Sequence, residues 1–206
     1  MTIGLQGRRV AILATDGVEQ VELVEPRKAL DAAGAETQLV SLKPGRIQAY
    51  HHLDKGDTFD VDATVEEAMA SQFDALFIPG GVANPDAMRM DPRAVQFVRE
   101  FMVSDKPVAA ICHAAWMLVE ADAVAGRTLT SWPSLKTDIQ NAKGDWVDRE
   151  VVVDDKLVTS RKPADLPAFN AAIVKEFANR IEEAKVDQLS EQSFPASDAP
   201  PGPAAL

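Results

Sequence analysis

The sequence predicts an α/β fold with a mostly parallel sheet, helices on both faces and a cysteine at a nucleophile elbow. Short apolar runs at residues 10–14, 74–78 and 108–111 have the length of buried strands. Helix-compatible stretches alternate with these runs, a rhythm that is typical of a parallel sheet covered on both faces. Ligands of such folds bind beyond the carboxyl ends of the strands, so we expect one site that draws on several strand ends.

The first third of the chain predicts a β-α-β unit followed by a hairpin. Gly34 is placed to stop the first helix, and Thr64-Val65-Glu66-Glu67 is a capping-box pattern that predicts a helix start. The expected elements are a strand over 10–14, a helix over 19–33, a strand over 37–42, an edge hairpin within 43–62 and a short helix over 64–70.

The rest of the chain continues the alternation. Asp91-Pro92 supplies an N-cap and a first-turn proline for a helix, and an apolar stripe through Phe169 and Phe177 predicts a long final helix. The expected elements are strands over 74–78, 108–111 and 127–132, helices over 92–103, 133–142 and 166–184, a helix directly after residue 112, and a hairpin of 150–153 with 157–160.

Composition limits both the organisation and the partners. We expect a single domain over 1–185 and a flexible proline-rich tail over 186–206, because residues 193–206 hold four of the 13 prolines and little to bury. The formal charge of −11 disfavours nucleic acid and anionic membrane surfaces. No run reaches the roughly 20 apolar residues of a membrane span. The lone cysteine fits a reducing compartment, so we expect a cytoplasmic protein.

Neither a metal nor a cofactor is expected. His51-His52 lacks the partner spacing of a zinc site, and we interpret both side chains as solvated. The glycines of Pro79-Gly80-Gly81 are not followed by the Gly-Lys-Ser/Thr of a phosphate loop, and there is no G-x-G-x-x-G.

Cys112 is the residue that the sequence marks most strongly for chemistry. It lies where the apolar run 108–111 turns directly into a helix-compatible run, which is the setting of a nucleophile elbow. The N–H groups and the dipole of the new helix would stabilise a thiolate there. A lone cysteine in an apolar run is more often a small buried hydrophobe. Its place at the end of the run, next to His113, favours the catalytic interpretation.

Carboxyl groups follow the first strand. Glu19 and Glu22 lie one turn apart at the start of the first helix, where the helix dipole alone favours acidic residues. One of the two carboxyls could instead reach the sulfur of Cys112. Burial there would keep it protonated and able to donate or shuttle a proton. We expect Glu22 to face away or to brace the helix.

Glycines and an aspartate follow the strand at 74–78. Gly80 and Gly81 form an ordinary turn or, with the N–H of His113, an oxyanion hole. His113 needs a carboxylate from elsewhere to fix its tautomer, and Asp86 in the next loop is the candidate. Capping a helix is the commoner role of an aspartate in such a position.

Together these residues resemble the PfpI-type family, within the superfamily of the class I glutamine amidotransferase-like fold that also contains the Parkinson-associated deglycase. The resemblance covers roughly Arg8 to Phe177. Its motifs, in chain order, are residues 16–23 (DGVEQVEL), 77–81 (FIPGG), 110–113 (AICH), 130–133 (TSWP), 146–148 (WVD) and 159–166 (TSRKPADL).

The resemblance implies a flavodoxin-like three-layer sandwich with Cys112 as the nucleophile and Glu19 as the carboxyl that touches its sulfur. It also implies that His113 is the general base and that its orienting carboxylate, at the position of Asp86, comes from a neighbouring subunit, so that the protein is a dimer or larger homo-oligomer. The family usually has Gly-Pro where this chain has Ala114-Ala115, and some members carry glutamate at the position of Asp86.

Activities described for the family are intracellular proteolysis, glutathione-independent conversion of methylglyoxal, deglycation and stress responses of uncertain chemistry. The resemblance therefore implies a cysteine hydrolase or lyase acting on a small-molecule carbonyl or a peptide, without a cofactor. The three enzymatic activities share addition of a thiolate to a carbonyl. The alternative is a non-enzymatic redox-sensing or chaperone-like stress protein that uses an oxidisable Cys112.

Overall fold

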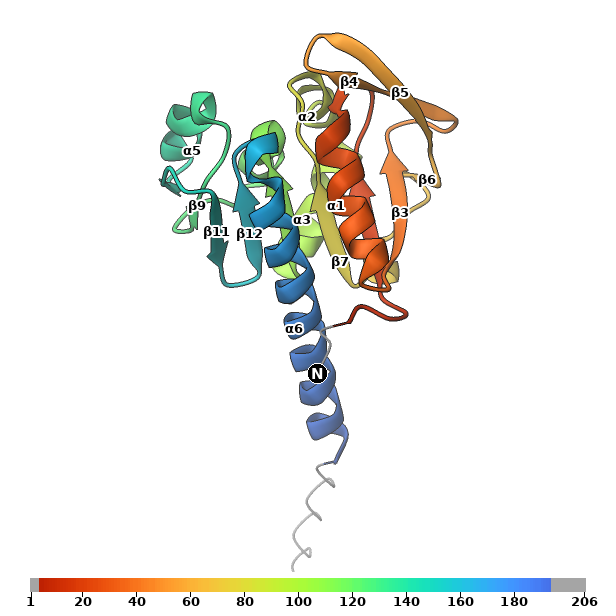
Figure 1. Cartoon of the computed structure of the whole chain (residues 1–206). Helices are drawn as coiled ribbons and strands as arrows, with labels where there is room; N and C mark the ends of the chain where they lie inside the picture. Colours follow the sequence, from red (N-terminus) through yellow and green to blue (C-terminus); the bar gives the residue numbers. More distant parts are fainter. Residues whose placement is uncertain (1–3, 194–206) are drawn as a thin grey trace, which may run out of the picture.

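Seven strands form the central sheet, in the order β11-β12-β8-β7-β1-β3-β6 (Figure 1). The computed structural model describes residues 4–193 of the chain. The strands are β1 (Arg9–Leu13), β3 (Glu36–Ser41), β6 (Ala63–Thr64), β7 (Ala75–Ile78), β8 (Val108–Ile111), β11 (Val151–Asp154) and β12 (Leu157–Ser160). Only β11 is antiparallel to its neighbour. The prediction of a mostly parallel sheet is confirmed.

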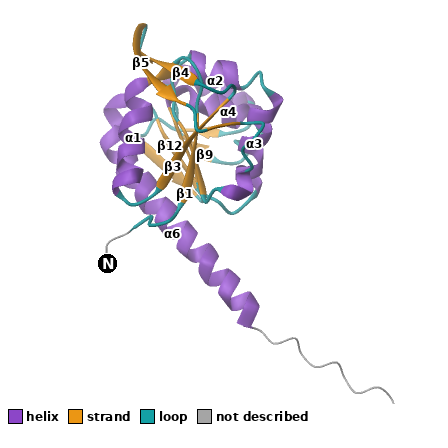
Figure 2. Ribbon diagram, turned by 90° about the vertical axis from the view of Figure 1, so that its right-hand side faces the viewer, coloured by secondary structure: helices purple, strands orange, loops and turns teal. Residues whose placement is uncertain are grey.

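Helices cover both faces of this sheet (Figures 1 and 2). They are α1 (Gln20–Ala32), α2 (Ala83–Met88), α3 (Pro92–Val103), α4 (Ala115–Glu120), α5 (Lys136–Asn141) and α6 (Leu166–Ser193). The apolar side chains of α1 and α6 pack against one face, and those of α3, α4 and α5 pack against the other. The three-layer sandwich is thus confirmed.

The central strands β7 and β8 are buried along their whole length, and β1 is buried from Val10 to Leu13, because both faces of these strands are covered. In β7, Phe77 packs against Phe169 of α6 with ring centroids 6.0 Å apart, while its neighbours Leu76 and Ile78 belong to the opposite core. Such strands are continuously apolar rather than alternating, and this is why the sequence showed them clearly. Because β1, β7 and β8 run parallel to one another, their carboxyl ends meet at one edge of the sheet.

The expected hairpin forms, but it belongs to a second sheet. Strands β4 (Arg46–His51) and β5 (Asp54–Asp60) are antiparallel, and β4 pairs in parallel with β2 (Val18–Glu19). This three-stranded sheet lies at the top of Figure 1. The hairpin is therefore not an edge of the central sheet, and its partner is the segment that leads from β1 into α1.

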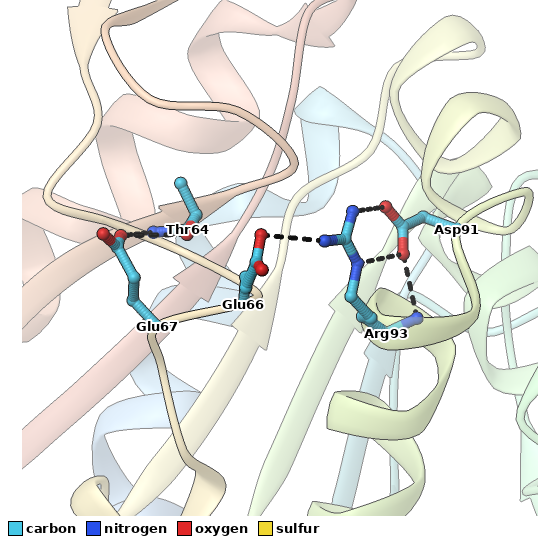
Figure 3. A network of polar contacts seen from close by, with 5 residues as sticks. All are labelled: Thr64, Glu66, Glu67, Asp91 and Arg93. Carbon is cyan, nitrogen blue, oxygen red and sulfur yellow. Dashed lines mark hydrogen bonds and ion pairs between the residues drawn. The ribbon is translucent and has the colours of Figure 1, made fainter.

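Only the carboxylate half of the expected capping box forms at Thr64, because the Glu67 N–H donates to the Thr64 carbonyl and not to its hydroxyl. The N–H and Oγ1 of Thr64 both donate to Glu67 Oε2, at 3.0 and 2.9 Å (Figure 3). Thr64 pairs in β6, and Glu66 is held by Arg93, which also binds Asp91 at the start of α3. This half of the box therefore closes a turn at a strand end, and in place of the expected helix only a 3-10 helix, Ala70–Gln72, follows.

Three further expectations need correction. The loop expected over 82–86 is mostly helical, because Val82 is the N-cap of α2 and residues 83–86 lie within it. The strand expected over 127–132 shortens to β9 (Thr128–Leu129), which pairs in parallel with β10 (Asp145–Trp146). Helix α6 continues to Ser193, so the boundary expected at residue 185 falls inside a helix; the rest of the expected tail, residues 194–206, lies outside the described part of the chain. Between residues 4 and 193, no helix is long and apolar enough to cross a membrane.

Candidate active site

The chain turns sharply at Cys112, between β8 and a 3-10 turn (Cys112–Ala114) that leads into α4. The φ angle of Cys112 is +63°, a left-handed conformation that costs a non-glycine residue about 1–2 kcal/mol. The N–H of Trp132 donates to the carbonyl of Cys112 at 3.2 Å and helps to hold this turn. Backbone strain of this kind is concentrated at functional sites, and the expected elbow is present.

Glu22, and not Glu19, is the carboxyl beside the sulfur. Its side chain is fully buried, Oε2 accepts the N–H of Gly80 at 3.1 Å, and the carboxyl interacts directly with Cys112. Oε1 is buried and accepts no hydrogen bond from the described residues. The expected roles of the two glutamates are therefore exchanged, because α1 begins at Gln20 and turns Glu22 toward the core.

Glu19 serves a different part of the structure. It is the last residue of β2 and pairs with Tyr50 of β4. Its Oε2 accepts the backbone N–H of His52, the first turn residue of the hairpin, at 3.0 Å. Glu19 thus joins the site to the hairpin, and the role that the resemblance implied for it belongs to Glu22.

Burial raises the pKa of both members of the Glu22–Cys112 pair. Burial, above all, raises the pKa of Glu22 to about 8, although its contact with Cys112 lowers it. Burial also raises the pKa of the Cys112 thiol, and charge on Glu22 raises it further, whereas the N–H groups of His113 and Gly81 lower it. The helix start alone therefore does not favour a thiolate. At neutral pH, however, Glu22 is protonated and can donate to the sulfur instead of repelling it.

His113 lies against Cys112. Its Nδ1 is 3.2 Å from Cys112 Sγ, and its ring stacks on Trp132 with centroids 5.8 Å apart and an interplanar angle of 24°. Burial lowers the pKa of His113, which favours the neutral imidazole. A neutral ring nitrogen at this distance can accept the thiol proton.

The two glycines after β7 have separate roles. The N–H of Gly80 is already used by Glu22, so the proposed oxyanion hole loses this donor, whereas the N–H of Gly81 points to the sulfur. The fully buried Asn84 fixes the loop, because its Nδ2 donates to the carbonyls of Pro79 and Gly80 at 2.8 and 3.0 Å. Its Oδ1 accepts the N–H of Thr15 at 2.7 Å and so joins the ends of β1 and β7.

Replacing Gly80 with alanine should destabilise the protein. An added Cβ would collide with Glu22 Oε2 and would lie 2.6 Å from Cys112 Cβ. Overpacking of this kind costs about 1–3 kcal/mol. We expect the free energy of unfolding measured in urea to fall by that amount. An unchanged value would contradict the tight contact between Glu22 and the elbow.

A cavity of about 800 Å³ opens over these groups. It is bordered by Cys112, His113, Glu22, Glu19, Gly81 and Asp86 and by Asp16, Gly17, Tyr50, His52, Leu53, Val82, Ala83, Trp132 and Pro163. Asp86 is exposed, in the first turn of α2. Sequence reasoning missed Tyr50, His52 and Trp132, which reach the cavity from segments far along the chain. Among the described side chains, those of residues 4–179, no cluster of three or more His, Cys, Asp or Glu could hold a metal.

The site consists of a strained cysteine at the carboxyl edge of a mostly parallel sheet, with a buried carboxyl and a histidine beside the sulfur. These features define a cysteine-centred α/β protein. The chain belongs to the DJ-1/PfpI family, whose model matches residues 8–176. The family resemblance stated from the sequence is thereby confirmed.

Named relatives share most of the domain. General stress protein 18 of Bacillus subtilis is 44% identical over 80% of this chain and 94% of its own length. A deglycase of Pyrococcus abyssi is 43% identical over 81% of this chain and 98% of its own length. Among solved structures, DJ-1beta of Drosophila melanogaster superposes with a TM-score of 0.75 at 26% identity, covering 88% of this chain and 97% of that one. The flavodoxin-like fold expected of such proteins is the one observed.

Proposed function

We propose that this protein is a cysteine-dependent stress-response enzyme that acts on small aldehydes or on glycated groups. The observation that carries the proposal is the contact of Cys112 Sγ with both Glu22 and His113 at the floor of a cavity of about 800 Å³. The size suits a small-molecule ligand. The names of the related deglycase and general stress protein support the same class of chemistry.

The proposed first step is addition of sulfur to a carbonyl carbon. His113 Nδ1 takes the thiol proton, the sulfur lone pair forms the carbon–sulfur bond, and the carbonyl π electrons move to oxygen. The N–H groups of Gly81 and His113 lie beside the sulfur, and we assign stabilisation of the oxyanion to them. The proton held by Glu22 can then be delivered to that oxygen. No cofactor is needed for this sequence.

The test compares three carbonyl substrates with and without the nucleophile. Methylglyoxal, a glycated peptide and casein would each be incubated with wild-type protein and with Cys112→Ala. We expect turnover of methylglyoxal or of the glycated peptide by the wild type and none by the variant. Cleavage of casein alone would identify a peptidase. Equal rates for wild type and variant, or no turnover together with stable oxidation of Cys112 to a sulfinate by peroxide, would contradict the proposal and favour the redox-sensing alternative.

We also propose that the protein acts as a homo-oligomer in which Asp86 of one subunit orients His113 of the next. Asp86 is exposed in α2 at the rim of the cavity. Among the side chains that the structure describes, those of residues 4–179, only that of Cys112 lies within hydrogen-bond distance of the His113 ring. A histidine is a better general base when a carboxylate fixes its tautomer. We propose that Asp86 of a second subunit supplies this carboxylate.

A further inference from the structure

The tip of the β4–β5 hairpin forms part of the wall of the Cys112 cavity. His51 and Asp54 pair across the hairpin, so His52 and Leu53 make a two-residue turn. Tyr50, His52 and Leu53 all border the cavity. The position of this tip therefore sets the shape of the space beside the nucleophile.

Glu19 fastens the tip. Although it is only 8% exposed, its Oε2 accepts the N–H of His52 at 3.0 Å. His52 Nδ1 lies 3.6 Å from the same oxygen, which adds an ion pair when the imidazole is protonated. His52 has a φ of +58°, a conformation for which two-residue hairpin turns favour glycine, asparagine or aspartate. A buried acceptor thus holds an unfavourable turn residue in place.

The segment 16–20 makes other hydrogen bonds to the hairpin, but these hold the strands and not the tip. Asp16 Oδ1 accepts the N–H of Gln48 at 2.8 Å, and the N–H of Gly17 donates to the carbonyl of Gln48 at 2.9 Å. The side chain of Gln20 exchanges two hydrogen bonds of 2.6 Å with Asp57. Removing the Glu19 side chain would therefore leave the hairpin attached while releasing its turn.

The tip presents an apolar side chain to the mouth of the cavity. Leu53 is 93% exposed, and Val82 and Trp132, which border the same cavity, are also exposed large hydrophobic residues. These three are close to half of the exposed large hydrophobic side chains in the described part of the chain. Exposed apolar side chains that gather at a ligand cavity favour an apolar ligand group.

We infer that Glu19, acting through His52, is a positioning residue for the hairpin tip. Leu53 on that tip then determines specificity for carbonyl compounds whose reactive carbon carries an apolar aryl or branched alkyl group. This inference rests on the proposed function only where it speaks of turnover. The wall itself can be tested without turnover, because Cys112 is the only cysteine of the chain.

The test compares alkylation of Cys112 by iodoacetamide and by N-benzyliodoacetamide. Each reagent forms a carbon–sulfur bond and releases iodide, so the ratio of the benzyl rate to the plain rate cancels the reactivity of the sulfur. Relative to a free small thiol, the wild type should favour the benzyl reagent. We expect Leu53→Ser and Glu19→Ala each to lower the ratio about fivefold, the scale of partly burying one apolar side chain.

Two controls separate positioning from general damage. Glu19→Gln keeps a carbonyl acceptor for the His52 N–H and should keep the wild-type ratio. Val103→Ser removes another highly exposed apolar side chain, at the end of α3 and away from the cavity, and should also leave the ratio unchanged. Wild-type ratios in both Leu53→Ser and Glu19→Ala would overturn the inference. So would a loss in Glu19→Gln as large as that in Glu19→Ala.

A turnover measurement completes the test. In Glu19→Ala, the ratio of kcat/KM for phenylglyoxal to kcat/KM for methylglyoxal should fall about fivefold, through the KM for phenylglyoxal. Equal losses for the two compounds would overturn the inference. No turnover of either compound by the wild type, with the alkylation ratios shifted as expected, would instead contradict the proposed function and support the apolar wall.

Discussion

Glu22→Gln should lower kcat/KM for the preferred carbonyl substrate by about 10²- to 10⁴-fold, the usual contribution of a positioned general acid or base. The amide has the size of the carboxyl and can still accept the Gly80 N–H, but it cannot deliver a proton to the oxyanion or take one back. Glu25→Gln is a matched control, because Glu25 lies in the same helix and forms an exposed ion pair with Lys28; its activity should equal that of the wild type.

The pH dependence gives this prediction a second readout. Because burial raises the pKa of Glu22 to about 8, the carboxyl is protonated below that pH and ionised above it. An ionised Glu22 raises the pKa of Cys112 and disfavours the thiolate. Wild-type activity should therefore fall as the pH rises through about 8, and the residual activity of Glu22→Gln should show no such fall. A wild-type alkaline limb that persists in the variant would assign the titration to another group.

The same pKa shift should change how the stability of the protein depends on pH. A carboxyl whose folded-state pKa lies above the unfolded value of 4.5 is harder to ionise in the folded protein. The free energy of unfolding of the wild type should thus decline from about pH 4.5 to about pH 8, relative to that of Glu22→Gln. A constant difference across this range would mean that Glu22 ionises as easily in the folded protein as in the unfolded chain.

The sequence alone did not settle which of the two glutamates, Glu19 or Glu22, lies beside Cys112. Both glutamates lie within one turn of the start of α1, and which one faces the core depends on where β2 ends. That point is set by pairing of Glu19 with Tyr50, about thirty residues away. One local signal was available: Glu22 falls on the buried stripe of α1 with Leu23, Pro26 and Leu30. A charged residue on such a stripe is the informative exception.

The turn at Cys112 could be predicted from the sequence, whereas the position of the hairpin at the cavity could not. The sharp turn at Cys112 could be predicted because the residues directly before and after it change from an apolar strand pattern to a helical one. His52 could not, since only the pairing of β4 with β2 brings it to the cavity. Trp132 likewise reaches Cys112 through a backbone hydrogen bond between segments twenty residues apart. Local sequence pattern therefore located the sharp turn at Cys112, whereas the walls of its cavity depend on long-range pairing of strands.

Single substitutions of His113 and Asp86 by alanine should each abolish most of the activity, about 10²- to 10⁴-fold if the two residues act as general base and orienting carboxylate. If Asp86 serves the neighbouring subunit, the two inactive variants should complement each other when mixed. In a dimer that exchanges subunits at random, half of the molecules would be hybrids. One of the two sites in each hybrid would be intact, so about a quarter of the wild-type activity should return.

An arrangement within one chain makes the opposite prediction, and it is a real alternative because Asp86 and His113 border the same cavity. Each hybrid would then hold one site without Asp86 and one without His113, and mixing would recover nothing. Subunit exchange must be shown independently, for example by mass spectrometry of differently labelled protomers. The variant carrying both substitutions, mixed with wild type, controls for passive stabilisation, because it can lend no intact partner. Recovery near a quarter with the single variants, and none above the wild-type contribution with the double variant, would place Asp86 across the interface.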